Sequence, residues 1–123
     1  MFEQLAARVN ADADLLRRGR FVNTTILIAV DETDFLMRIQ DGRIVEIKRG
    51  PFITPDYSFA LRARGSVWEK FWQPLPPIGF NDIFALIKSK SMRVEGDLHP
   101  LMANLLYFKD VIAMPRKYRE VAR

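Results

Sequence analysis

The sequence predicts an α+β fold in which helices cover a sheet of five strands. Two observations carry this prediction. Short segments with a period of two, or with continuous β-branched residues, are typical of strands, and they alternate with segments whose apolar residues recur every three or four positions, as in helices. Glycine and proline residues separate these segments. The expected order is a helix, three strands, a fourth strand, two short helices, a fifth strand and a long helix.

The first half of the chain is expected to form one helix and three strands. Residues 2–16 carry apolar side chains at helical spacing. Residues 24–30, TTILIAV, are β-branched and apolar on both faces, which predicts a strand that is covered from both sides. Asp41-Gly42 is a strong signal for a hairpin turn. The two strands that this turn joins are expected at residues 34–40 and 43–49.

The register of this hairpin is predicted from the need to keep one face of the sheet apolar. A two-residue loop would place Met37 opposite Glu46. A loop that is one residue longer, with Gly42 in a left-handed bulge, places Met37 opposite Val45. We therefore expect the longer loop.

The second half of the chain alternates strands with helices. Residues 57–63 alternate apolar and polar side chains, which predicts an amphipathic strand. Ser66 and Glu69 form a capping-box pattern that opens a short helix. Asp97 is expected to cap the long helix, because a carboxylate there accepts backbone N–H groups of the first turn. The remaining elements are expected at residues 81–88 (helix), 92–95 (strand) and 98–112 (long helix).

Composition is that of one ordered domain. The chain has 123 residues, of which 49% are apolar and 28% charged. It contains no cysteine, so a disulfide framework and a thiolate metal site are excluded. Charged residues interrupt the N-terminal segment, which argues against a signal peptide, and no apolar run approaches the length of a membrane span. The last three residues do not match a peroxisomal targeting signal. We expect a cytoplasmic protein.

The net charge of +4 is concentrated near the two ends of the chain. The ordinary interpretation of such charge runs is a solvated surface and a solubilising tail at residues 116–123. The alternative is attraction to an acidic membrane surface or partner enzyme through Arg116, Lys117 and Arg119. Nucleic-acid binding is not expected, because the aromatic residues are not interleaved with the basic ones.

No catalytic, cofactor or metal signature is present. His99 is the single histidine, and it is expected to be an exposed side chain in the first turn of the long helix. The chain lacks the G-x-S-x-G, H-E-x-x-H and glycine-rich phosphate-loop motifs. We therefore expect no cofactor, no metal and no catalytic residue.

Several short segments follow one another in a specific order and spacing: Asp56–Phe59 (DYSF), Ser66–Glu69 (SVWE), Asp82–Leu86, and Met92–Asp97 (MRVEGD) running into Leu98–Leu106. Together they resemble the sterol-carrier-protein type-two lipid-transfer domain, in the form of its small stand-alone bacterial members. With the Asp41-Gly42 hairpin upstream, the likeness covers most of the chain.

This resemblance implies a five-stranded, mainly antiparallel sheet that encloses an apolar tunnel with the helices. The implied function is non-catalytic binding or transfer of a fatty acid, an acyl-CoA, or a sterol or isoprenoid-like lipid. The tunnel is expected between the sheet and the helices at residues 81–88 and 98–112. Its predicted walls are Trp68, Phe71, Trp72, Phe80, Phe84, Ile87, Met92, Leu101, Met102, Leu105 and Leu106.

Two other functions remain open from the residues alone. The first is an accessory module that docks on a lipid-processing enzyme through residues 75–78 (LPPI). The second is an enzyme of the cone-shaped isomerase type, which needs a buried carboxylate with a raised pKa. The pattern places Glu46, Glu95 and Asp97 at polar or capping positions, which argues against the isomerase.

Overall fold

The fold is seen in a computed structural model, which describes residue 2 and residues 4–121, with side chains up to residue 118. The strands are β1 (Thr24–Val30), β2 (Thr33–Gln40), β3 (Arg43–Arg49), β4 (Phe59–Ala63) and β5 (Met92–Gly96). The helices are α1 (Leu5–Asn10), α2 (Ala13–Arg18), α3 (Gly65–Phe71), α4 (Ile83–Lys88), α5 (His99–Ala103), α6 (Leu105–Ala113) and α7 (Pro115–Val121).

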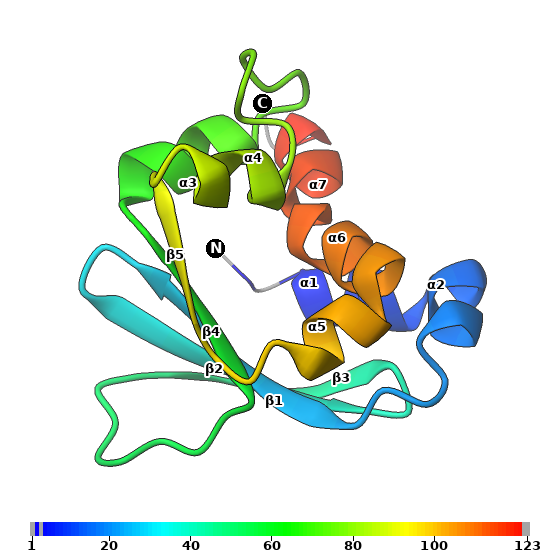
Figure 1. The fold of residues 1–123 in the computed structure, drawn as a ribbon. Coiled ribbons are helices and arrows are strands. Elements are labelled where there is room, and N and C mark those ends of the chain that lie inside the picture. The colour runs from blue at the N-terminus through cyan, green and yellow to red at the C-terminus, as the bar shows by residue number, and fades with distance from the viewer. Residues whose placement is uncertain (1, 3, 122–123) are drawn as a thin grey trace.

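The five strands form one sheet in the order β3-β2-β1-β4-β5. Strands β1 and β4 are parallel, and the other neighbours are antiparallel. The helices lie on one side of this sheet, whereas the loop that joins β3 to β4 lies on the other (Figure 1). The predicted α+β class and mainly antiparallel sheet are therefore confirmed. Within the described residues, no helix combines the length and the apolar character that a membrane crossing requires.

Strand β1 is covered on both faces, as its composition predicts. Ile26 and Ile28 face the helices and belong to the main core. Leu27 and Ala29 face the other way, into a smaller apolar cluster. Tyr57, from the loop that precedes β4, packs against this smaller cluster. A strand at the centre of the sheet is thereby removed from water on both sides.

The β2–β3 hairpin keeps one face apolar through a bulge within β3, and not through the longer loop that was expected. Asp41 and Gly42 have φ angles of 52° and 79°, the left-handed conformations that a two-residue type I′ turn requires. The predicted longer loop is therefore wrong. The extra residue is Val45, which leaves the ladder in a bulge further along β3 and is 44% exposed. Beyond the bulge Met37 faces Ile47, so both apolar side chains point to the core.

Two predicted helices are broken into shorter ones. The N-terminal segment forms α1 and α2, because the Asp12 carboxylate accepts the Leu15 N–H and starts a second helix. The long helix is interrupted at Asn104, whose backbone is not helical (φ −130°, ψ 44°) and whose side-chain amide donates to the Pro100 carbonyl. Polar side chains that bond to nearby backbone compete with helix propagation in this way.

The N-terminal cap of α5 agrees with the prediction, whereas that of α3 differs from it. The Asp97 carboxylate accepts the His99 N–H at 3.0 Å, so the expected cap of the long helical segment is confirmed. The predicted capping box is wrong, because α3 begins at Gly65 and Ser66 already lies inside the helix. The cap comes instead from Asp31, whose carboxylate accepts the Gly65 N–H at 2.8 Å.

An ion network crosses the outer face of β4 and β5. Arg62 and Arg93 lie directly opposite each other in the ladder, an arrangement that repels. Glu95 bridges them, at 2.5 Å from Arg62 Nε and 3.0 Å from Arg93 Nε. The Arg62 hydrogen bond lowers the pKa of Glu95, with a further contribution from the two positive charges. The network therefore depends on an ionised Glu95.

We expect Glu95→Gln to lower stability by about 1 kcal/mol at neutral pH, because the two arginines lose their shared counter-charge and the pair is partly exposed. Because the folded-state pKa is depressed, the wild-type advantage is present above the ordinary glutamate pKa. It is lost as the pH falls through the folded value. Urea unfolding of both proteins across this pH range measures the difference. Glu46→Gln, at the exposed pairs with Arg38 and Lys48, is the matched control; an equal loss in both variants would contradict the prediction.

Candidate functional site

The space between the sheet and the helices is occupied by two tryptophans. The rings of Trp68 and Trp72 stack at 4.8 Å with an interplanar angle of 22°, and both side chains are buried. Trp68 Nε1 donates to the Ala29 carbonyl at 2.8 Å, and Trp72 Nε1 donates to the Ile112 carbonyl at 2.9 Å. Buried indole N–H groups need such partners. The two rings are thereby tied to the sheet on one side and to α6 on the other.

The eleven predicted wall residues fall into three groups. Five are buried in the core: Trp68, Phe71, Trp72, Met92 and Leu101. Four are half-buried against it: Phe80, Phe84, Ile87 and Leu105. The other two lie on the surface: Met102 is 55% exposed and Leu106 is 67% exposed.

The exposure of Met102 and Leu106 corrects their predicted position in an enclosed wall. The prediction extended one apolar stripe along a continuous helix. Met102 precedes the break at Asn104, in α5, where only Leu101 is buried. The break changes the orientation of α6, which accounts for Leu106. Tyr107 and Val111 then face the core, and both are buried.

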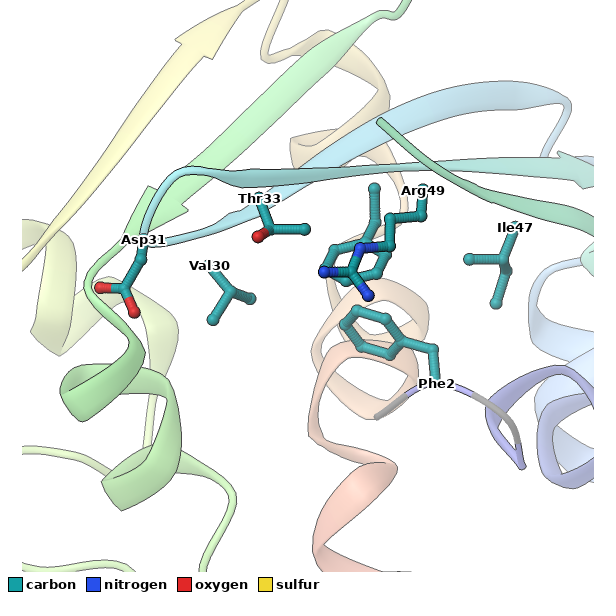
Figure 2. A pocket seen from close by; sticks show the side chains of 7 residues that line it. Phe2, Val30, Asp31, Thr33, Ile47 and Arg49 are labelled. Carbon is teal, nitrogen blue, oxygen red and sulfur yellow. The ribbon is translucent and has the colours of Figure 1, made fainter. Parts of the chain in front are cut away.

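An open hollow of about 530 Å³ lies at the end of the sheet, on its helix-facing side (Figure 2). Its walls expose more apolar surface than those of four other hollows of the molecule. The lining residues come from β1 to β3, the turn between β1 and β2, and the start of the chain: Phe2, Val30, Asp31, Thr33, Phe35, Ile47 and Arg49.

Phe2 forms the wall between this hollow and the tryptophan stack. Its ring meets Phe35 edge-on at 4.9 Å and Trp72 edge-on at 5.5 Å. The side chain is 8% exposed although it precedes the first helix. The hollow therefore ends where Phe2 closes access to the aromatic core.

Two charged residues, Asp31 and Arg49, line the hollow, and the Asp31 side chain bonds to another part of the protein. The Asp31 carboxylate is already the cap of α3. Arg49 lies opposite Phe35 in the β2–β3 ladder, and its side chain points into the hollow toward Phe2 (Figure 2). The hollow thus has an apolar floor with a cation beside it.

The basic contact surface predicted from Arg116, Lys117 and Arg119 is only partly available in the structure. Residues 115–121 form α7, and the Arg116 side chain bonds to the protein's own backbone. Its Nε donates to the Phe71 carbonyl at 2.6 Å and its terminal nitrogen to the Asn81 carbonyl at 3.0 Å, with the guanidinium 4.4 Å from the Phe71 ring centre. Burial lowers the pKa of Arg116. Lys117 is exposed, whereas the side chain of Arg119 lies outside the described residues.

Sequence reasoning missed all seven residues of the hollow. A signal was present, since Phe35 and Ile47 belong to the apolar face of the predicted hairpin, but nothing local shows that Phe2 folds back against that face. His99 is exposed, as expected. The described part of the chain holds no group of three or more metal-ligating side chains.

No family model and no curated protein matches this sequence. Solved structures do match. The crystal structure of sterol carrier protein 2 superimposes with a TM-score of 0.75 at 10% identity, covering 93% of this chain and 92% of that chain. The ubiquinone synthesis protein UbiJ-SCP2 gives 0.60 at 17% identity, covering 90% and 84%.

A third match is part of a larger enzyme. The inverting sec-alkylsulfatase Pisa1 from Pseudomonas sp. gives a TM-score of 0.59 at 15% identity, over 88% of this chain but only 15% of the sulfatase. At such identities, likeness shows the fold alone. The fold that the sequence segments indicated is thereby confirmed: the chain has the fold of sterol carrier protein 2.

Proposed function

We propose that the protein binds the apolar part of a lipid in the hollow at the end of the sheet and carries out no reaction on it. The observation that carries this proposal is an apolar-walled hollow against an aromatic core, in a fold shared with sterol carrier protein 2. Its volume is within the range of small-molecule sites. Each methylene that leaves water there contributes about 0.8 kcal/mol, so desolvation alone supports binding.

Phe2 sets how deep such a ligand reaches. With Phe2 in place, an apolar chain lies over Val30, Phe35 and Ile47. If the Phe2 ring swings out, the same chain reaches Trp72, which belongs to the set predicted from the sequence. Phe2 therefore occupies space that a longer ligand would use.

An accessory role on a lipid-processing enzyme is the second candidate. Two neighbours in fold support it, because one is a ubiquinone synthesis protein and the other holds a similar domain within a sulfatase. The loop between α3 and α4 exposes Leu75 and Ile78 almost completely. Exposed apolar side chains in one loop are suited to contact with another protein.

The isomerase-type alternative has little support. It needs a carboxylate within the apolar interior, and the described residues bury no charged side chain. Glu46, Glu95 and Asp97 all lie at or near the surface. A lipid-binding role requires no such group.

We expect Ile47→Trp to abolish saturable binding of a fluorescent long-chain lipid, because the larger ring fills the hollow. Val45→Trp is the matched control, since Val45 lies on the same strand but in the exposed bulge. Fluorescence titration measures both, and thermal unfolding shows that each variant folds. Binding that survives Ile47→Trp would remove the hollow as the lipid site.

We expect Phe2→Ala to strengthen lipid binding and weaken the fold. The ligand gains the space of the ring, for an affinity gain of about tenfold, whereas the unliganded protein loses up to about 3 kcal/mol from the lost aromatic contacts. Titration and thermal unfolding are measured together. Phe21→Ala is the control, because Phe21 is 80% exposed and should change neither quantity. A Phe2→Ala protein with lower stability and unchanged or weaker binding would mean that Phe2 is purely structural.

A further inference from the structure

We infer that Arg49 makes this site select lipids with an anionic headgroup, a carboxylate or a phosphate, over neutral lipids. The inference rests on the proposed function, since it assigns the polar end of the ligand whose tail occupies the hollow. It gives the ligand a defined chemistry and orientation, with its charge at Arg49 and its chain over Val30, Phe35 and Ile47.

The position of Arg49 in the sheet is unusual for a charged residue. After the bulge at Val45, Ile47 faces Met37 and Arg49 faces Phe35, so Arg49 shares the helix-facing side with apolar residues. Its neighbour Lys48 points to the other side and pairs with Glu46 at 3.6 Å. Arg49 is exposed to solvent and stands at the rim of the hollow, beside its apolar walls.

Within the part of the chain that the structure describes, no acidic side chain forms an ion pair with Arg49. Asp31, the other charged residue of the hollow, accepts the Gly65 N–H and lies at the opposite end of the hollow in Figure 2. An anionic group that enters the hollow therefore meets a cation that no described acidic side chain neutralises.

The chemistry of the guanidinium defines the class of headgroup. It carries a positive charge, and its planar set of donors matches two oxygens of a carboxylate or a phosphate. A neutral hydroxyl offers a single acceptor and no charge. The same tail thus binds more tightly when it carries an anionic end than when it carries an alcohol.

The test compares three ligands with one tail: palmitate, hexadecyl phosphate and hexadecanol. The wild-type protein should bind at least one of the two anions about tenfold more tightly than hexadecanol, and the anion that it prefers identifies the headgroup. Arg49→Gln should remove this preference, so that neither anion binds more tightly than hexadecanol. Arg49→Lys should keep part of it, because the charge remains without the planar set of donors.

Lys48→Gln is the matched control, with the same loss of charge one residue away on the other face. It should bind all three ligands as the wild type does. An equal loss of anion binding in Lys48→Gln and Arg49→Gln would overturn the inference, since only the net charge would then matter. Thermal unfolding of each variant shows that it is folded.

The outcomes separate this inference from the proposed function. If hexadecanol binds as tightly as both anions, the lipid site stands and the role of Arg49 is wrong. If none of the three ligands binds to the folded wild-type protein, the lipid site itself is wrong, and the headgroup inference falls with it. A preference for an anion that persists in Arg49→Gln would place the headgroup elsewhere.

Discussion

The stacked pair Trp68 and Trp72 is the constraint on which the rest of the structure depends. Through its indole N–H groups the pair joins α3 to the backbone of β1 and of α6. It also occupies part of the space between the sheet and the helices in which the tunnel was predicted. The hollow lies beyond it, at the end of the sheet, where Phe2 packs on Trp72.

The strands were predictable because their signals are local. Period-two alternation and the Asp41-Gly42 turn lie within a few residues of the elements that they define. The Val45 bulge was not predictable, because it accompanies a contact between distant segments. The side chain of Asn10 in α1 both accepts the Ile44 N–H and donates to the Ile44 carbonyl, at 2.9 Å and 3.0 Å. This amide covers the free edge of β3 and links it to α1, 34 residues earlier in the chain.

The candidate site was harder to predict than the fold, for a physical reason. An apolar pattern shows that a side chain leaves water, but it is the same whether that side chain fills a core or lines a cavity. For Trp68 and Trp72, the difference depends on backbone carbonyls about 40 residues away. For Arg49, which is exposed, only the register with Phe35 shows that it stands on the side of the sheet where the hollow lies.

The shape of the hollow bears on the choice between carrier and accessory module. An open hollow at the end of a sheet leaves part of a bound lipid accessible, whereas a closed tunnel buries nearly all of it. Less buried apolar surface means weaker binding and faster release. If the proposed function holds, a lipid in this hollow would stay near the surface, because Phe2 and the tryptophan stack block deeper insertion. Such a position would suit presentation of the lipid to another protein better than long-term storage.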